Sequence, residues 1–338
     1  MASFAQFGND LHTGKRSFDI VGRRKLWYLI AGAMILIAIL GPTLRGGFVF
    51  GIEFTGGSEF VVSDVATQNQ QTATKAVSSV VPAAVPKVST VSSSGIRVQT
   101  DQLTPEESDS VRKALADAYG VPVTQVTSSF IGPSWGADIT GQALRGLIIF
   151  LFLAAIVMAL YFRTWKMSAA AMVALLHDLV ITAGFYGITG FEITPAAVIG
   201  FLTILGYSLY DTVVVFDKIR ENTSEDGSES RRTFADSVNL AVNQTLVRSI
   251  NTSIVAALPV ASILFIGAFV LGAGTLRDIA LALLIGILVG TYSTIFIASP
   301  LYAQLRSGEP GIRKRDKKAL ALRAKAAASS KPSEEVSV

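Results

Sequence analysis

The sequence predicts an α-helical polytopic membrane protein with six transmembrane helices and one inserted α+β domain outside the membrane. The first observation is the composition: half of the 338 residues are hydrophobic, 16% are charged and the mean hydropathy is +0.49. A soluble domain carries about a quarter charged residues. The second observation is that the apolar residues gather in runs close to the ~20 residues that a helix needs to cross a bilayer core.

Six apolar runs give the expected spans. They lie near residues 26–44, 143–162, 167–188, 195–216, 252–272 and 279–304. The first run does not have the pattern of a cleavable signal peptide, because a polar-rich segment precedes it and Gly41-Pro42 follows it in place of a small-x-small cleavage site.

Lysine and arginine are concentrated on one side of these spans. They precede the first span, occupy the link "RTWK" at 163–166, and recur between the fourth and fifth spans and after Arg306, whereas the links 189–194 and 272–275 contain none. By the positive-inside rule, both termini are expected to be cytoplasmic. The expected organisation is a cytoplasmic segment 1–25, the first span 26–44, an extracytoplasmic domain 45–140, five further spans within 141–305, and a basic disordered cytoplasmic tail 306–338.

The residue inventory disfavours several functions. The chain has no cysteine and only two histidines, His12 and His177, so disulfides are excluded and a zinc site has almost no ligands to draw on. No loop combines a nucleophile with a base, so an enzyme is the least expected class and no metal or cofactor is expected. The net charge of +4 comes from basic residues beside apolar runs and in the tail, which fits membrane topology better than nucleic-acid binding.

The basic tail has a simple expected role. Its composition predicts a disordered topology anchor that also touches anionic lipid. A ribosome or nucleic-acid contact stays open, but no motif in the tail supports one.

The segment between the first two spans alternates strand and helix signals in the order β-α-β-β-α-β. Strand signals lie at 58–63 and 123–131, and residues 87–100 read as two strands around a Ser-Ser-Gly turn. Helix signals lie at 69–81 and 104–120. The second helix has a full set of end signals, with Thr104 and Glu107 forming a capping box and Gly120 at its C-terminal end. This order is the ferredoxin-like split βαβ pattern, and we expect a protein-contact module.

Three ionisable residues lie at membrane depth, where each costs about 2.5–3.5 kcal/mol on insertion scales and therefore needs a reason. Asp178 falls near the middle of the third span beside His177. Asp211 lies in the cytoplasmic third of the fourth span, and Arg248 precedes the apolar part of the fifth. Because these two spans run in opposite directions, Asp211 and Arg248 are expected at comparable depth, where they could pair.

Polar side chains flank this expected pair at helical spacing. On the fourth span these are Tyr207 and Ser208, and on the fifth they form a stripe with Arg248, namely Gln244, Asn251 and Thr252. The stripe is expected to face the bundle interior or a water-filled crevice. A carboxylate that takes a proton from one side and releases it to the other could use the membrane potential, worth about 2.3 kcal/mol per charge per 100 mV.

Structural explanations stay open for each of these residues. Arg248 could extend to the cytoplasmic surface, and Asp211 could be a hydrogen-bonded structural acid. His177 and Asp178 could form a helix-packing hydrogen bond. Asp278, beside Arg277 at the outer end of the sixth span, could belong to an interfacial pair.

Five stretches carry a resemblance to a known family and occur in that family's order. They are "FGIEFTGGSEF" (50–60), "ALLHDLVIT" (174–182), "GYSLYDTVVVFDKIREN" (206–222), "NQTLVRSINTS" (243–253) and "LRDIALALLIGILVGTYSTIFIASP" (276–300). The chain resembles the SecF family over roughly residues 20–305. SecF is the smaller subunit of the bacterial SecD–SecF protein-export complex, in the RND superfamily.

The resemblance implies a fold, a location and a function. It implies a plasma (inner) membrane protein of six spans that pairs with SecD and uses the proton motive force to draw unfolded preproteins from the SecY–SecE–SecG channel, with SecA acting upstream. The proton-coupling residues of the family correspond to Asp211 and Arg248, with Asp178 and Asp278 as weaker candidates. Membrane lipid is the remaining implied contact.

The resemblance also points to a junction and to two departures. The stretch "GIEFTGGS" resembles the family's hinge between the first span and the external domain, and Gly51, Gly56 and Gly57 suit a flexible or positive-φ connection. Glu53 stands where the family more often has Asp, and Tyr210 where it more often has Asn. The alternatives are an RND-type proton-driven exporter of small molecules or lipids, and a non-transporting translocon scaffold.

Overall fold

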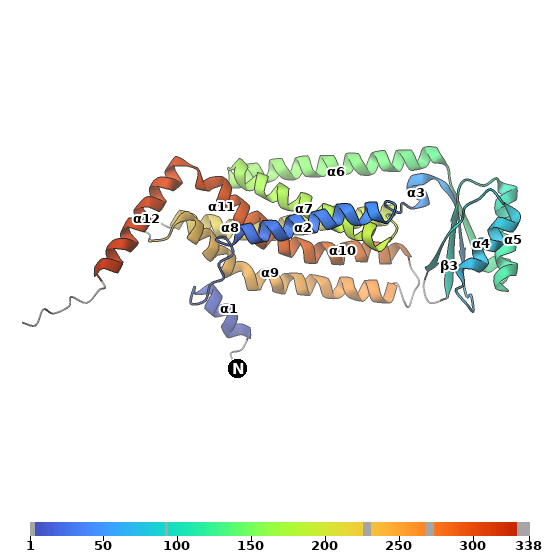
Figure 1. Cartoon of the computed structure of the whole chain (residues 1–338), viewed down its shortest axis with the longest axis horizontal. Helices are drawn as coiled ribbons and strands as arrows, with labels where there is room; N and C mark the ends of the chain where they lie inside the picture. Colours follow the sequence, from blue (N-terminus) through green and yellow to red (C-terminus); the bar gives the residue numbers. More distant parts are fainter. Residues whose placement is uncertain (1–3, 92–93, 226–230, 268–273, 330–338) are drawn as a thin grey trace, which may run out of the picture.

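A computed structural model describes residues 4–91, 94–225, 231–267 and 274–329. The molecule is elongated (Figure 1). A bundle of long helices forms its middle, a small sheet with two helices closes one end, and three shorter helices lie at the other. We call these the domain end and the tail end.

Within these described residues, six helical segments are long and apolar enough to cross a membrane. They are α2 (Arg24–Leu44), α6 (Pro133–Phe162), α7 (Trp165–Thr189), α8 (Pro195–Glu225), α9 (Phe234–Phe265) and α10 (Gly274–Ser293). Helix α10 continues through the π-helical segment η3 (Thr294–Ala298) into α11 (Ser299–Ser307). All six predicted spans fall on these helices, although residues 268–272 of the fifth predicted span lie outside the described residues.

Glycines allow two pairs of helices to approach closely. A Cβ atom at Gly200 would lie 2.6 Å from Ala282 Cβ, so α8 and α10 nearly touch there. A Cβ atom at Gly184 of α7 would lie 2.6 Å from the Cα and 2.8 Å from the carbonyl oxygen of Ala38 in α2. Helix α6 stands apart from this tightly packed group along most of its length (Figure 1). Only about a tenth of the residues in its most apolar stretch are buried.

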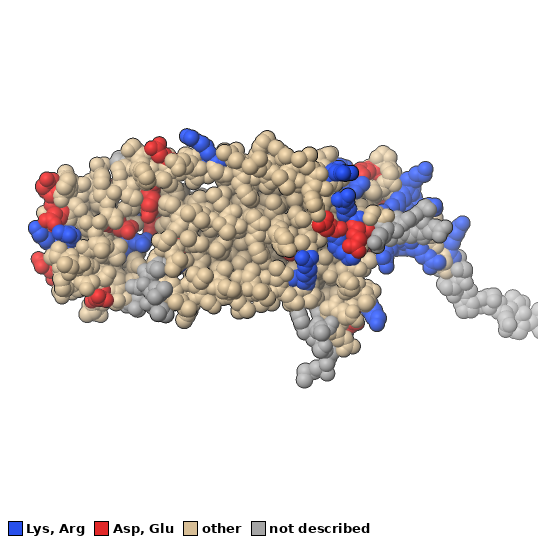
Figure 2. Space-filling view, turned by 180° about the vertical axis from the view of Figure 1, so that it is seen from behind, with Lys and Arg blue, Asp and Glu red and all other residues tan. Residues whose placement is uncertain are grey.

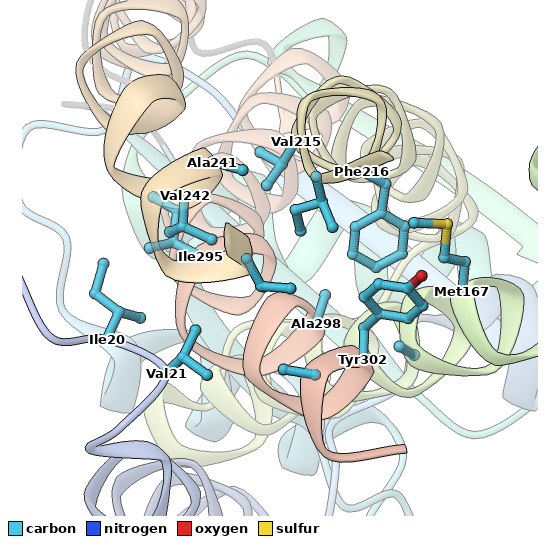
Figure 3. Close-up of a cluster of buried hydrophobic side chains, with 14 of the residues drawn as sticks. Ile20, Val21, Met167, Val215, Phe216, Ala241, Val242, Ile295, Ala298 and Tyr302 are labelled. Carbon is cyan, nitrogen blue, oxygen red and sulfur yellow. The ribbon is translucent and has the colours of Figure 1, made fainter. Parts of the chain in front are cut away.

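A buried apolar cluster ties the helices together at the tail end. Phe216 of α8, Tyr302 of α11 and Met167 of α7 are its large members, and Ile20 and Val21 extend it to the segment before α2 (Figure 3). The cluster therefore fixes the cytoplasm-directed ends predicted for the third, fourth and sixth spans against one another.

The external domain is a four-stranded antiparallel sheet with two helices on one face. Its elements are β1 (Gly57–Val62), α4 (Gln70–Val80), β2 (Lys87–Val91), β3 (Gly95–Thr100), α5 (Pro105–Tyr119), η1 (Val123–Gln125) and β4 (Val126–Ile131). The strand order is β2-β3-β1-β4. Phe60, Ile96 and Val98 point into the core under α4 and α5. The opposite face of the sheet is turned toward the helix bundle (Figure 1).

The helix signals in this domain are confirmed at residue level. The capping box of Thr104 and Glu107 is present at the start of α5, and Gly120 ends the helix in the left-handed conformation with φ of 66°. The short helix α3 (Ile52–Thr55) leads from the first span into β1.

The prediction of a disordered tail is wrong for most of its length. Residues Pro310–Ser329 form helix α12, while 330–338 lie outside the described residues. Ala, Leu, Lys and Arg dominate α12, and these are strong helix formers. Ile312 and Ala319 are also buried, so packing adds to the propensity. Helix α1 (Phe4–His12) lies at the same end of the bundle.

Candidate functional site

Asp211 is a buried acid in the middle of α8. The residue is 7% exposed, and its Oδ1 atom accepts a hydrogen bond of 2.9 Å from the Ser249 hydroxyl of α9. Its Oδ2 atom is buried and has no hydrogen-bond partner among the described residues. A buried carboxylate with one bonded oxygen is an energetically costly arrangement in a helix bundle.

The expected pairing of Asp211 with a buried Arg248 is not present in this structure. Arg248 is exposed, and in the described part of the chain it has no ion pair with Asp211 or with any other acid. The reason is its helical phase. Successive residues of an α-helix are turned by about 100°, so Ser249 faces α8 while Arg248 lies about 100° further round α9, exposed and out of contact, with only its charge acting on Asp211.

The predicted polar stripe on α9 does not face the interior of the helix bundle of this chain. Asn251 is exposed and Thr252 is half-buried. Gln244 accepts a 2.8 Å hydrogen bond from the Asn222 side chain and donates to the carbonyl oxygen of His12. The inward stripe is instead a row of hydroxyl residues at a spacing of four, Thr245, Ser249 and Ser253, none more than 7% exposed.

Asp178 forms a second buried acid site, between α7 and α8. It is 1% exposed, and its Oδ2 atom accepts a hydrogen bond of 2.6 Å from the Ser208 hydroxyl. Its Oδ1 atom lies 3.3 Å from His177 Nδ1. A Cβ atom at Gly290 of α10 would lie 3.5 Å from Asp178 Oδ2, so α10 closes the site from a third side.

Two tyrosines flank Asp211 on α8 and lie in different environments. Tyr207, one turn before the acid, is half-buried. Tyr210, the position that departs from the family pattern, is 59% exposed. The Tyr210 side chain therefore does not help to bury Asp211 within this chain.

Asp278 lies near the domain end and belongs to a separate polar group. Its Oδ1 atom accepts hydrogen bonds of 3.1 and 3.0 Å from Arg277, and its Oδ2 atom accepts one of 3.0 Å from the Thr194 hydroxyl. Asp178, Asp211 and Asp278 therefore lie at three separate sites, and at each site the carboxylate accepts a hydrogen bond from a hydroxyl group. Sequence reasoning missed the donors Ser249 and Thr194.

The glycine junction has the backbone conformation expected at two of its three positions. Gly56 and Gly57 have φ of 73° and 136°. A Cβ atom at Gly57 would also lie 2.5 Å from the carbonyl oxygen of Thr100. Gly51 has an ordinary φ of −65°, and its N–H donates to the carbonyl oxygen of Ile193 in the α7–α8 link.

An ion-pair network that sequence reasoning missed joins the external domain to the bundle. Arg97 of β3 donates a 2.8 Å hydrogen bond to Glu192 of the α7–α8 link and lies 3.6 Å from Glu59 of β1. Gln99 donates to both carboxylates. We call Glu59, Arg97, Gln99 and Glu192 the domain latch.

Glu53 lies beside the domain latch and is affected by it. Burial raises the pKa of Glu53 above its ordinary value, the charges of Glu59 and Glu192 add to the rise, and Arg97 opposes it. Within the described residues, no group of three or more His, Cys, Asp or Glu side chains could hold a metal ion.

The fold and these sites define a multi-pass membrane protein whose helix bundle encloses acids and whose external domain is fastened to one end. Residues 111–308 match the family model described as protein export membrane protein SecD/SecF, C-terminal. The chain belongs to this family, on the SecF side.

Curated relatives agree with the match. The protein translocase subunit SecF of Streptomyces coelicolor is 43% identical over 335 residues, covering 99% of this chain and 89% of the relative. The protein of the same description from Mycobacterium tuberculosis is 41% identical over 327 residues, covering 94% of this chain and 73% of the relative.

A solved structure has the same arrangement. The crystal structure of SecDF, a translocon-associated membrane protein from Thermus thermophilus, superposes with a TM-score of 0.74 at 29% identity. The match covers 86% of this chain, and this chain spans 39% of the SecDF chain.

Proposed function

We propose that this chain is the SecF-type subunit of a Sec protein-export machinery and works with SecD to promote preprotein translocation across the plasma membrane. The observation that carries the proposal is a buried, half-bonded acid, Asp211, in a chain whose curated relatives are translocase subunits. The role is that of a membrane accessory subunit coupled to the proton motive force, not that of an enzyme.

The coupling is proposed to act through a change of partner at Asp211. Burial beside Ser249 without an ion pair favours the neutral acid more than direct pairing with a cation would, because an unpaired charge at this depth is costly. Arg248 is the neighbouring residue of α9, and a rotation of α9 by about one residue, or 100°, would bring its guanidinium to the acid. That ion pair would favour the deprotonated form, so rotation of α9 would alternate proton uptake and release.

A SecD-type partner is the proposed second half. This chain spans 39% of the SecDF chain, which leaves room for a further set of helices. The outer surface of α9 supports the same conclusion. Ile254, Val255 and Leu258 are 52%, 68% and 62% exposed there, on the same helix as the exposed Arg248. A partner packed on this surface would bury Arg248 and Asn251.

The proposed topology puts both termini in the cytoplasm and residues 45–140 outside. Its support is the distribution of Lys and Arg, which gather at the tail end (Figure 2). The β-α-β-β-α-β element order and the strand order β2-β3-β1-β4 support a ferredoxin-like assignment for the external domain. We propose that this domain contacts preproteins leaving the SecY–SecE–SecG channel, downstream of SecA.

The test uses Asp211→Asn and Arg248→Met in cells that depend on the variant chain. Each variant is checked for folding and for copurification with SecD, and release of a secreted reporter is then followed with and without an ionophore. We expect both variants to copurify with SecD and to lose the part of reporter release that depends on the membrane potential. Unchanged potential-dependent release by both folded, SecD-bound variants would contradict the proton-coupling role.

Copurification is the separate test of the partner. A SecD-like chain is expected in equal amount with this chain. Its absence, with a homo-oligomer in its place, would favour the RND-type exporter instead.

A further inference from the structure

Helix α12 is fixed to the tail end of the bundle by one of its faces. Arg315 donates hydrogen bonds of 3.0 Å to the Thr223 carbonyl oxygen and 3.1 Å to the Ser237 hydroxyl. The Asp316 carboxylate accepts one of 2.7 Å from the Phe234 amide. Arg323 forms an ion pair with Asp236. These partners are the ends of α8 and α9, so α12 is a held element.

The start of α12 is fixed as well. Glu309, immediately before the helix, pairs with Arg306 at 3.0 Å and with Lys166 of α7 at 3.0 Å. Its pKa is held below its ordinary value by the hydrogen bond from Arg306 and, less strongly, by the one from Lys166. The Glu309 carboxylate is therefore charged at neutral pH and connects α7 and α11 at the start of α12.

The opposite face of α12 is cationic. Its exposed basic residues have no ion pair or side-chain hydrogen bond within the described part of the chain. They are Arg313, Lys314, Lys317, Lys318 and Lys325, and we call them the cationic face. At about 100° per residue they fall within an arc of about 140°, and the fixing residues Ile312, Asp316, Ala319 and Arg323 fall on the other side.

The direction of the cationic face selects the kind of partner. The fixed face lies against the ends of α8 and α9, so the cationic face points away from the bundle. Figure 2 shows blue side chains projecting from this end of the molecule, beyond the tan surface of the helix bundle. Electrostatic attraction to a membrane surface falls off within about 8 Å at physiological salt. This orientation favours a soluble polyanion over a lipid surface.

The chemistry of the cationic face narrows the partner further. Four of its five charges are lysines, which are depleted at protein–protein interfaces. The residues that fall between them on this face include Ala321 and Ala324. Leu320, at 53% exposure, and the half-buried Leu322 lie at the edges of the face. Lysines without apolar or aromatic anchors suit a phosphate backbone, where affinity comes from counterion release.

We propose that the cationic face of α12 is a docking surface for the phosphate backbone of a nucleic acid, RNA or DNA. The sequence-based expectation for these charges is a disordered topology anchor that touches anionic lipid, with a nucleic-acid contact left open. The proposal uses the proposed topology only for the compartment, which would be the cytoplasm. It does not depend on proton coupling, so the two stand or fall in different experiments.

The test measures binding of the full-length chain in zwitterionic nanodiscs to a fluorescent RNA duplex of about 20 base pairs, and to a DNA duplex of equal length. With five phosphate contacts, affinity is expected to fall about 500-fold between 50 and 200 mM salt. The triple variant Lys314→Gln, Lys317→Gln, Lys318→Gln keeps two contacts, so its affinity is expected to fall only about 12-fold over that range. A difference between the two duplexes identifies the natural form.

Two matched variants separate the effect of where the lysines lie from the effect of their charge on binding. Lys75→Gln, Lys87→Gln, Lys113→Gln removes three lysines from the external domain and is expected to bind as the unchanged chain does. Replacing Lys314, Lys317 and Lys318 by arginine is expected to keep the salt dependence. Equal binding by the glutamine variant of α12 and the unchanged chain would overturn the proposal. So would tighter binding to polyglutamate, or to vesicles rich in phosphatidylglycerol, than to either duplex.

Discussion

At the residue scale, Asp211 has two consecutive residues of α9, Arg248 and Ser249, as candidate partners. Ser249 donates to the acid in this structure, while Arg248 faces outward. Both residues have the reach to bind a carboxylate, but one is a neutral donor and the other a charge. We therefore expect the protonation of Asp211 to depend on the rotational position of α9, as the proposed coupling requires.

The hydrogen bond between Ser249 and Asp211 is expected to contribute measurably to stability. A double-mutant cycle with Ser249→Ala and Asp211→Ala should give a coupling of about 0.6 kcal/mol, and at most about 1.7 kcal/mol, in the free energy of unfolding, as for other hydrogen bonds between membrane helices. The measurement is unfolding in mixed detergent, and Ser249→Thr should keep most of the stability. The exposed Thr203→Val serves as control with Asp211→Ala. Additive effects of the Ser249 and Asp211 substitutions would mean that the contact contributes nothing.

Glu53 gives a pH-dependent expectation. Its folded-state pKa is raised by burial, so its contribution to stability is fully present below the unfolded value of about 4.3 and is lost as pH rises through the folded-state value. Glu53→Gln cannot ionise. We expect it to raise the melting temperature at pH 7 and to change it little at pH 4.

The measurement for Glu53 is thermal unfolding of the purified chain across that pH range. The exposed Asp117→Asn is the control and should leave the pH dependence unchanged. A melting temperature that falls at pH 7 in Glu53→Gln would indicate that the ionised carboxylate makes a stabilising contact with Arg97.

The sequence predicts which residues are buried acids more reliably than it predicts their partners. Asp178, Asp211 and Asp278 stand out because a charge inside an apolar run is conspicuous. The partner Ser249 does not, because serine is common in helices and α9 has polar residues on two faces. Only the packing of α9 against α8 decides that Thr245, Ser249 and Ser253 point inward and Arg248 outward.

At the element scale, apolar length predicts the spans but underestimates α8 and α9. Helix α9 begins at Phe234, well before the predicted span at 252, and its first turns are polar. They are stabilised by contacts from distant parts of the chain. Asn239 accepts hydrogen bonds from the amides of Ile20 and Val21, and Phe234 donates to Asp316. Hydropathy does not detect a polar helical segment that is stabilised by contacts with distant parts of the chain. Helix α12 is not predicted from the sequence because it, too, is polar and held by such contacts.

The close contact of α7 with α2 gives an expectation for a single glycine. Gly184→Val would push a side chain into the backbone of Ala38, with Cβ only 2.6 Å from its Cα atom. Overpacking of this kind costs about 1–3 kcal/mol. Gly32→Val on α2 is the matched control, because nothing lies within 4 Å of its Cβ position.

Unfolding in mixed detergent measures both glycine variants. Gly184→Val is expected to lower the free energy of unfolding, and Gly32→Val to change it little. Equal stabilities of the two variants would show that α2 moves aside at no cost and that the contact does not fix the first span.

At the scale of the whole molecule, the external domain and the bundle are joined at more than their covalent connections. The domain latch links β1 and β3 to the α7–α8 link, and Phe50 forms a parallel bridge with Ile193 of that same link. Asp278 lies close enough for its charge to act on Arg97. The sequence predicts the two modules separately, but no local pattern relates Glu192 to Arg97 across 95 residues of chain. Their contact follows from tertiary structure alone.

The domain latch is expected to hold the external domain in one orientation. Glu192→Gln removes the charge of the acid and keeps its shape, while Arg97→Met removes the guanidinium and leaves Gln99 as the remaining donor. A hydrogen bond to a charged group contributes about 1.5–3 kcal/mol, so either change should broaden the range of domain orientations. The chain contains no cysteine, so spin labels can be attached at Lys75→Cys on α4 and Ile199→Cys on α8 without background.

Pulsed electron resonance then reports the distance distribution between the two labels. The unchanged latch should give one narrow distribution, and both latch variants a broader one. Lys113→Met, which alters a charge on the far side of the domain, should keep the narrow form. Because burial of the ion pair is shared between the two modules, loss of either partner should broaden the distribution equally. If neither Arg97→Met nor Glu192→Gln broadens the distribution, the contact between β3 and the α7–α8 link does not orient the external domain.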